Sequence, residues 1–230
     1  MADSIQKENT TREDNRYYKL YLIRDRIRHG LILHSLFNLL IRVGVSINPY
    51  WIDVEGLHLT EEPDIRDDKE RYRIAPVDQA IILELYENLH WNTAELKERL
   101  TSDYHSVGLF REDALTAFML MRYQSFAFRG NHISLSENEA YLENMYTYED
   151  YRGRSLAPYL RYQGYKLLKA DGKTRCLSIT QYFNKSSQKF KAKLNAKHSE
   201  FWLHIGLFNK VSWNFRLKKY PGAYPPGNES

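Results

Sequence analysis

Residues 147–160, with the sequence TYEDYRGRSLAPYL, combine residue types that suit the binding of a phosphate group. Gly153 and Ser155 are small, so a phosphate can approach the backbone there, and Arg152 and Arg154 add two positive charges. An apolar segment with helical spacing follows, and the first N–H groups of that helix would point at the anion. A solvated helix cap of the same composition is the alternative interpretation.

The flanks of this turn predict a strand before it and a helix after it. Residues 139–147 have the composition of a strand, whereas Leu156 and Leu160 recur at the spacing of a helix face. Pro158 fits a helix start, because its missing N–H would have no helical partner there. We therefore expect a strand, a turn that holds an anion, and a helix.

The stretch AYLENMYTYEDYRGRSLAPYL resembles the core motif of the GCN5-related N-acetyltransferases (GNATs). In that superfamily an Arg or Gln, two variable residues, a Gly, one variable residue and a Gly or Ala cradle a pyrophosphate after a strand. The matching residues are Arg152, Gly153, Arg154, Ser155, Leu156 and Ala157. Ser155 stands where Gly is usual, and serine narrows the backbone conformations that are allowed at this position.

A second motif of the superfamily lies farther along the chain. It consists of an Asn after a strand, a small residue three positions later, an apolar residue six later, and a Lys nine later that precedes a Leu. The matching residues are Asn184, Ser187, Phe190, Lys193 and Leu194. The superfamily often has a Tyr seven positions after the Asn, which protonates the departing thiolate, and this chain has Lys191 there. The resemblance covers roughly residues 72–210.

The resemblance implies a mixed α/β (α+β) fold, with a GNAT-like mixed central sheet of splayed strands flanked by helices. It also implies that acetyl-CoA, or another acyl-CoA, lies between two strands that separate, here 139–147 and 174–183. Backbone N–H groups of the first strand would hold the pantetheine and polarise the thioester carbonyl. The implied coenzyme-binding residues are Met145, Tyr146, Thr147, Arg152, Gly153, Arg154, Ser155, Leu156, Ala157, Asn184, Ser187 and Lys191.

Transfer to an amine requires a group that accepts a proton, and Glu143 is the first candidate. It lies in YLENMY, which looks like the YLE-x-x-Y run of aminoglycoside 6'-acetyltransferases, where the Glu meets the substrate amine. An ion pair with a neighbouring Lys or Arg is the competing interpretation, and Glu139 and Glu149 are weaker alternatives. Tyr182, at the end of the second strand, is the candidate that protonates the thiolate, with Tyr146 as another choice.

Composition places the chain among ordinary globular proteins. It has 230 residues, 43% of them hydrophobic, and a formal net charge of +4. A single Cys cannot build a disulfide framework, and the first residues show no secretion signal, so we expect a reducing cytoplasm. The eight His lack paired metal spacing, and Cys176 lacks an orienting His, so the sequence predicts no metal and no cysteine nucleophile.

The rest of the pattern mixes strands and helices. Further strands are expected at 72–76, 106–110 and 114–126 and in the segments EFWLHIGLF and VSWNFRL, and further helices at 77–89, 92–99 and 186–194. Residues 71–219 are thus expected to form the GNAT-like domain. Residues 1–16 are expected to be a disordered tail, and residues 220–230 a Pro/Gly-rich C-terminal tail that cannot continue a helix or a central strand.

Residues 17–70 are predicted to form a helical extension that packs on this domain, because apolar residues recur near helical spacing between residues 17 and 45. The apolar run LILHSLFNLLI is too short to span a membrane. Contact with the core or with a second copy of the chain, giving a homodimer, is favoured over an interfacial helix on a membrane surface.

Positive charge is concentrated in residues 184–220, where Glu200 is the one acidic residue. We therefore expect this region to attract anions. The basic residues are Lys185, Lys189, Lys191, Lys193, Lys197, Lys210, Arg216, Lys218 and Lys219. Nucleic acid is an alternative partner, since Trp202 and Trp213 could stack bases, but coenzyme phosphates and a packed strand pair explain the same residues more simply.

We therefore expect an acyl-CoA-dependent N-acyltransferase in which a primary amine attacks acetyl-CoA directly. A small-molecule amine such as an amino sugar is the expected acceptor, with polyamines, amino acids and protein N-termini as alternatives. A module that binds coenzyme A or an anion without turnover is a competing function. So is an acyltransferase that uses acyl carrier protein or a lipid-linked substrate.

Overall fold

The computed structural model describes residues 31–56, 61–90, 93–99 and 104–221. Its contacts divide the chain into two units. The larger unit is Asn48–His204 with Asn214–Ser230, and the smaller unit is Met1–Ile47 with Ile205–Trp213. Every residue that the sequence assigned to catalysis or coenzyme binding belongs to the larger unit.

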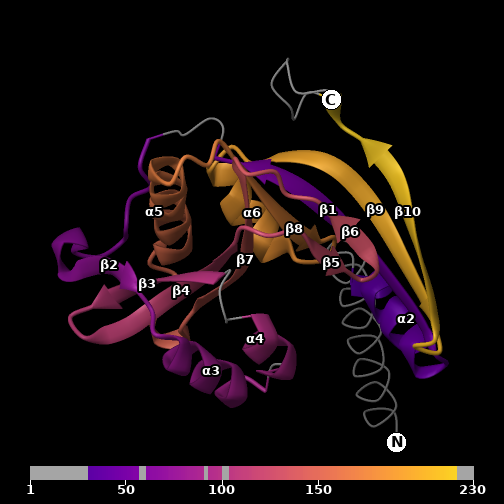
Figure 1. The fold of residues 1–230 in the computed structure, drawn as a ribbon. Helices are drawn as coiled ribbons and strands as arrows, with labels where there is room; N and C mark the ends of the chain where they lie inside the picture. Colours follow the sequence, from indigo (N-terminus) through magenta and orange to yellow (C-terminus); the bar gives the residue numbers. More distant parts are fainter. Residues whose placement is uncertain (1–30, 57–60, 91–92, 100–103, 222–230) are drawn as a thin grey trace, which may run out of the picture. The chain divides into compact units, whose positions relative to one another are not determined.

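An eight-stranded sheet has the strand order β10-β9-β1-β8-β7-β4-β3-β2 (Figure 1). The strands are β1 (Val45–Glu55), β2 (Tyr72–Pro76), β3 (Tyr104–Arg111), β4 (Ala114–Arg122), β7 (Glu139–Thr147), β8 (Arg175–Gln181), β9 (Lys197–Leu207) and β10 (Val211–Lys219). The α-helices are α2 (Leu31–Arg42), α3 (Gln79–Asn88), α4 (Thr93–Arg99), α5 (Leu156–Ala170) and α6 (Lys185–Lys193). Antiparallel pairs join β2, β3, β4 and β7, whereas β7 and β8 are parallel and linked by α5. The predicted mixed fold is confirmed.

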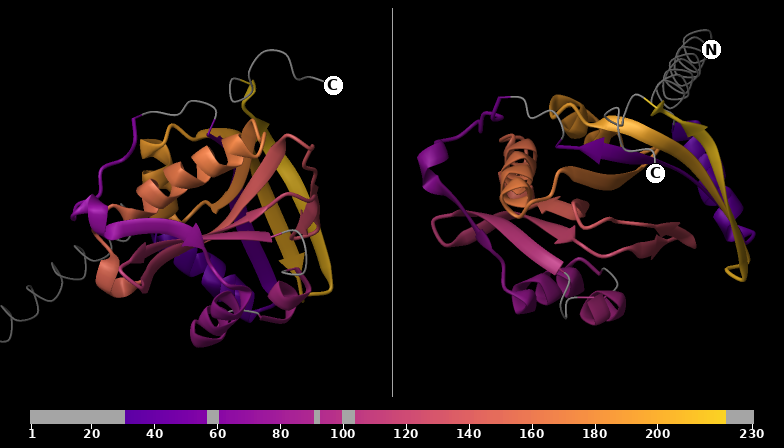
Figure 2. Two further views of the ribbon diagram at one scale, coloured as in Figure 1. Left: turned by 60° about the vertical axis from the view of Figure 1, so that its left-hand side comes forward. Right: turned by 45° about the horizontal axis from the view of Figure 1, so that its top comes forward.

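Helices cover both faces of this sheet in the larger unit, with α5 and α6 on one face and α3 and α4 on the other (Figure 2). Alternation along β4 produces both cores, because successive side chains of a strand point to opposite faces. Met119 and Met121 pack with α5, whereas Phe118 and Leu120 pack with α3 and α4. A small hairpin that the sequence did not predict, β5 (Phe126–Phe128) and β6 (Asn131–Ile133), covers a third core.

The strands β7 and β8 separate after a short parallel pairing. Glu139–Tyr141 pair with Arg175–Leu177, and both strands then continue without a further pair between them. From residue 142 on, β7 therefore no longer pairs with β8. This is the splayed arrangement that the resemblance implied.

β1 occupies residues for which the sequence predicted a helical extension, and that prediction is wrong at Val45–Glu55. The residues alternate as in a strand: Tyr50, Ile52 and Val54 are buried in one core, and the residues between them point to the opposite face. β1 lies between β8 and β9 and pairs antiparallel with β8. The predicted helical spacing does occur in α2, and residues 17–30 lie outside the described residues.

The smaller unit holds α2 and the turn that leads from it into β1. Gly44 in this turn has a φ of 82°, and its carbonyl accepts a hydrogen bond from the Phe208 N–H (2.6 Å). A Cβ at position 44 would overlap the Phe208 ring, so the position requires glycine. No helix in the described part of the chain has the length and hydropathy that crossing a membrane requires. The predicted tails lie outside the described residues except at 220 and 221.

Candidate active site

A cavity of about 640 Å³ lies at the N-terminal ends of α5 and α6, beside the end of β7. Most residues that the sequence assigned to coenzyme binding line it, although they come from separate segments. These residues are Met145, Tyr146, Thr147, Arg152, Gly153, Ser155, Leu156, Ala157, Asn184 and Ser187. The side chains of Arg154 and Lys191 lie elsewhere, for reasons given below.

Positive charge surrounds this cavity, which we call the anion pocket. Four cationic side chains line it, those of Arg66, Arg152, Lys189 and Lys193, and no Asp or Glu of the described chain does. Arg152 is bound to Glu149 (Nη1 to Oε1, 2.9 Å), whereas Lys189 and Lys193 are exposed. A ligand with several negative charges would be attracted to this cavity.

The turn before α5 leaves the first amides of that helix open to the anion pocket. Gly153 has a φ of 80° and Ser155 a φ of 61°, so both adopt the left-handed region. Ser155 is the N-cap of α5, but its side chain makes no capping hydrogen bond. The N–H groups of Leu156 and Ala157 are therefore not occupied by a cap, and such groups bind phosphates and other anions.

α6 directs a second helix N-terminus at the same cavity. Its N-cap is Asn184, whose side-chain oxygen accepts a hydrogen bond from the Ser187 N–H (3.0 Å). Ser186 and Ser187 line the pocket beside it. The dipoles of α5 and α6 thus both contribute partial positive charge to the pocket.

Arg154 stabilises the turn rather than lining the pocket. Its Nη1 lies 2.8 Å from Asp67 Oδ2, and its carbonyl accepts a hydrogen bond from the Arg66 N–H (2.9 Å). A hydrogen bond from Tyr72 and one from a backbone N–H, together with Arg154, lower the pKa of Asp67 to about 2. Arg154 is therefore paired with Asp67 and is not among the residues that line the pocket, and its role in coenzyme binding stays a prediction.

Lys191 also points away from the anion pocket. It is buried, and its Nζ lies 3.0 Å from Asp53 Oδ2 and 2.6 Å from Ser178 Oγ. Lys191 therefore does not line the pocket, because β1 places the carboxylates of Asp53 and Glu55 under α6. Its assignment to coenzyme binding stays a prediction.

Glu143 lies next to a bulge in β7, where Asn144 has no partner in β4. Its Oε2 is 3.1 Å from Nη2 of Arg122, and the two side chains are 17% and 6% exposed. The competing interpretation, an ion pair, is thus what the structure shows. A role for Glu143 as a proton acceptor stays a prediction.

Tyr182 and Tyr146, the two candidate proton donors, have different surroundings. Tyr182 lies outside the anion pocket, in an aromatic cluster with Trp51 and Phe201 at ring-centroid distances of 6.2 and 5.8 Å. Tyr146 lines the pocket, and the Arg152 guanidinium lies 5.6 Å from its ring centroid. Of the two candidates, Tyr146 is the one that lines the anion pocket.

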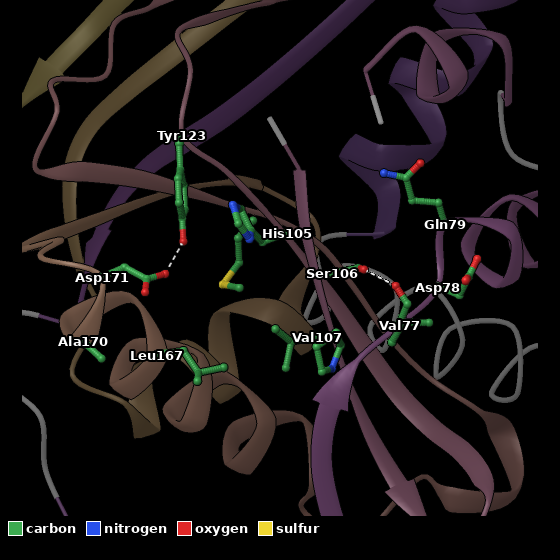
Figure 3. Close-up of a pocket in the computed structure, with 12 residues that line it drawn as sticks. Val77, Asp78, Gln79, His105, Ser106, Val107, Tyr123, Leu167, Ala170 and Asp171 are labelled. Carbon is green, nitrogen blue, oxygen red and sulfur yellow. Dashed lines mark hydrogen bonds between the residues drawn. The ribbon is translucent and has the colours of Figure 1, made fainter. Parts of the chain in front are cut away.

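A second cavity, of about 510 Å³, lies at the C-terminal end of α5 (Figure 3). It contains none of the predicted site residues. Tyr123 donates a hydrogen bond to Asp171 (2.8 Å), and His105 stacks on the Tyr123 ring at 4.6 Å. Burial and this hydrogen bond raise the pKa of Tyr123, so its hydroxyl remains protonated. Within the described residues, no group of His, Cys, Asp and Glu side chains suits a metal ion.

The predicted coenzyme-binding residues leave out seven that line the anion pocket: Arg66, Tyr151, Pro158, Ser186, Lys189, Phe190 and Lys193. Arg66 lies in a strongly charged connector far from both motifs, so nothing in its spacing indicated the pocket. Lys189 precedes Lys193 by four residues and therefore shares its helix face, a signal that was available.

Comparisons with known proteins support the fold. No protein-family model and no curated protein matches the chain. Among solved structures, the glucosamine N-acetyltransferase region of a fungal multi-domain GH3 β-N-acetylglucosaminidase matches with a TM-score of 0.52 and 17% identity, over 75% of this chain and 22% of that chain. A putative GNAT-family acetyltransferase from Novosphingobium aromaticivorans matches with a TM-score of 0.49 and 16% identity, over 71% of this chain and 66% of that chain.

The ribosomal-protein-S18-alanine N-acetyltransferase of Escherichia coli matches with a TM-score of 0.44 and 15% identity, over 54% of this chain and 76% of that chain. The chain thus spans just under two thirds of the Novosphingobium protein and less than a quarter of the fungal protein. The chain has the fold of the GCN5-related N-acetyltransferases.

Proposed function

We propose that the protein is an acyl-CoA-dependent N-acyltransferase that transfers an acetyl group from acetyl-CoA to a primary amine. The anion pocket carries this proposal. Two helix N-termini and four cations, without a carboxylate, suit the diphosphate and the ribose phosphate of coenzyme A. The separation of β7 from β8 supports the proposal as well, because a pantetheine arm can bond to the backbone of a strand where its neighbour diverges.

The proposed reaction is a direct attack. The amine nitrogen bonds to the acyl carbon, the carbon–sulfur bond breaks, nitrogen loses one proton, and sulfur gains one. N–H groups of β7 near Met145 would polarise the thioester carbonyl. Glu143 is proposed to accept the proton of nitrogen, since it adjoins the bulge in β7 and Arg122 orients its carboxylate. Tyr146 is the proposed donor of a proton to sulfur, in place of Tyr182.

The proposed acceptor is a small polar amine such as an amino sugar. Polar and aromatic groups follow Glu143 along the chain: Asn144 donates a hydrogen bond to the Tyr86 hydroxyl, and the rings of Tyr146 and Tyr148 pack edge to face at 5.5 Å. Hydroxyl, amide and carboxylate groups beside aromatic rings suit a hydroxylated amine. The YLE-type segment supports the same acceptor class.

A thiol-release assay with a panel of amines tests this function. We expect free thiol when acetyl-CoA meets an amino sugar, and we expect less with polyamines or peptide N-termini. Absence of thiol release with every amine class would contradict the acyltransferase proposal.

Replacing Glu143 by Gln tests the proposed proton acceptor. We expect the turnover number to fall about 100-fold or more while acetyl-CoA affinity is unchanged, since a general base contributes to the reaction and not to coenzyme binding. Glu112→Gln is the matched control, because Glu112 is another ion-paired carboxylate, bound to Arg71, and neither residue lines the anion pocket. An unchanged turnover number in the Glu143 variant would remove this residue from the mechanism.

A coenzyme-binding module without turnover is the second candidate. The ion pair of Glu143 with Arg122 favours it, and so does Lys191 at the position where the superfamily often has a tyrosine. A rise in melting temperature with acetyl-CoA, combined with no thiol release, would favour this module over the enzyme.

A further inference from the structure

A group of buried charges of opposite sign lies between β1 and the two helices α5 and α6. Two carboxylates of β1, Asp53 and Glu55, meet Arg161 of α5 and Lys191 of α6, and all four residues are at most 5% exposed. The formal charges cancel, two negative against two positive. We call these four residues the β1 clamp.

The contacts within the β1 clamp are short and specific. Arg161 binds Glu55 through two nitrogens, Nε to Oε2 at 2.9 Å and Nη2 to Oε1 at 3.0 Å. Lys191 Nζ lies 3.0 Å from Asp53 Oδ2 and 3.4 Å from Glu55 Oε1. Each cation therefore has a carboxylate partner on β1, and Lys191 links both carboxylates.

Neighbouring polar groups complete the coordination of the carboxylates. Ser178 of β8 and Tyr165 of α5 donate hydrogen bonds to Glu55, and Thr180 of β8 donates one to Asp53 (2.8 Å). His198 of β9 lies 2.6 Å from Asp53, through Nδ1, at the exposed side of the group. Buried charges are tolerated only with such full pairing, so removing one member leaves its partner uncompensated.

The β1 clamp acts on the two helices that form the anion pocket. Arg161 lies on the same helix as Leu156, whose turn lines the pocket, and Lys191 lies between the pocket residues Lys189 and Lys193. Phe190 belongs both to the pocket lining and to the core beside α5. A shift of either helix relative to β1 would therefore change the pocket.

We propose that Asp53 and Glu55 are positioning residues for coenzyme binding, which act through α5 and α6 and touch no ligand themselves. β1, which lies outside the segment that resembles the acetyltransferases, would thus help to shape the coenzyme site of this chain. This inference rests on the proposed function for the identity of the ligand. The positional effect itself can be measured without any ligand.

Asp53→Asn and the double variant Asp53→Asn/Lys191→Met test the proposal. The single variant leaves one positive charge in excess, because Glu55 alone then faces both Arg161 and Lys191. The double variant removes an oppositely charged pair and keeps the Glu55–Arg161 pair. We expect the dissociation constant of coenzyme A to rise about tenfold or more in the single variant and to return to within about threefold of wild type in the double variant. Backbone amides of α6 should exchange hydrogen faster in the single variant and near the wild-type rate in the double variant.

Glu200→Gln is the matched control, because Glu200 is paired with Arg216 (3.2 Å) across β9 and β10 and touches neither helix. It should change neither readout. Wild-type affinity and wild-type α6 exchange in Asp53→Asn would overturn the proposal. If Asp53→Asn does not fold, the double variant decides: binding of coenzyme A supports the proposal, and loss of binding overturns it.

The experiment also distinguishes failure of the proposed function from failure of the β1 clamp proposal. If the wild-type protein does not bind coenzyme A, the function is refuted, and hydrogen exchange in α6 alone decides on the β1 clamp. Faster exchange in the single variant with recovery in the double variant then supports the positional effect, and unchanged exchange overturns it.

Discussion

Three lysines of α6 have opposite environments within a few residues of one another. Lys189 and Lys193 are exposed at the anion pocket, whereas Lys191 is buried among the carboxylates of β1. Helix geometry separates them, because residues four apart share a face and the residue midway between them points elsewhere. The charges of Lys189 and Lys193 are accessible to a ligand on one side of the helix, whereas the charge of Lys191 is compensated by carboxylates on the other.

This comparison shows that residue type alone does not assign a function to a basic segment. Lys191 is stabilising only because Asp53 and Glu55 reach it from a distant part of the sequence. The pocket lysines have no such partner among the contacts of the described chain, so an anionic ligand is free to take that place. Removing charge should therefore reduce stability in one region and ligand affinity in the other.

The largest effect is expected from Glu55→Gln, which leaves Arg161 without its bidentate partner. A buried cation without compensation should lower the free energy of unfolding by about 3–5 kcal/mol. Urea denaturation followed by circular dichroism measures the loss. The variant Glu55→Gln/Arg161→Met should recover part of it, and a loss below about 1 kcal/mol in the single variant would contradict a compensated charge group.

The next largest effect is expected from acid, which should weaken the β1 clamp and lower the free energy of unfolding. Burial would raise the pKa of Glu55, but Arg161 and Lys191 outweigh it and hold that pKa well below its usual range. Burial likewise opposes a low pKa at Asp53, and its hydrogen bond to His198 and the charge of Lys191 outweigh it. Because both pKa values are depressed in the folded state, their stabilisation is complete above about pH 5 and is lost as the pH falls below about 4.

Denaturation at a series of pH values checks this direction. Each carboxylate contributes a slope of up to about 1.4 kcal/mol per pH unit in the acid range. Asp53→Asn/Lys191→Met has one depressed carboxylate fewer, so its stability should fall less steeply with acid than that of wild type. Equal slopes of stability against pH in wild type and the double variant would show that Asp53 does not contribute to the acid dependence.

A smaller effect is expected at the anion pocket, from Lys189→Ala combined with Lys193→Ala. Loss of two exposed charges should raise the dissociation constant of coenzyme A about tenfold, equivalent to about 1.4 kcal/mol, and should leave the melting temperature nearly unchanged. The difference from wild type should shrink as salt is added. Lys97→Ala on α4, on the opposite face of the sheet, is the control and should bind coenzyme A as wild type does.

The smallest effect concerns the turn itself. Ser155 holds a φ of 61°, which costs a residue with a side chain about 1 kcal/mol and costs glycine little. Ser155→Gly should therefore raise the melting temperature by a few degrees without weakening coenzyme binding. Gly153→Ala should lower the melting temperature, because Gly153 has a φ of 80°. A Ser155→Gly variant that is less stable than wild type would show that the serine side chain contributes more than its strain costs.

Local signals were enough to predict much of the larger unit. The strand at 139–147, the turn and the helix behind it follow from short-range pattern, and the helix predicted at 77–89 corresponds to α3, Gln79–Asn88. Most pocket residues could be assigned because two motifs carry them on fixed spacings. The splayed strands were expected from the resemblance and from nothing in local composition.

Long-range pairing accounts for what was missed. Asp53 and Glu55 are buried only because they meet Arg161 and Lys191, more than a hundred residues later in the sequence. A charged residue within an apolar run gives no local indication of such a partner. The same cause explains Arg154, whose partner Asp67 lies in a connector that had no predicted role.

The most direct test of the central claim is a calorimetric titration of the wild-type protein with coenzyme A and, separately, with pantetheine. If the anion pocket binds the nucleotide diphosphate, coenzyme A should bind at one site per chain, and pantetheine, which lacks the phosphates, should bind about 100-fold or more weakly. Equal affinity for the two compounds, or no binding of coenzyme A, would contradict the assignment of the pocket.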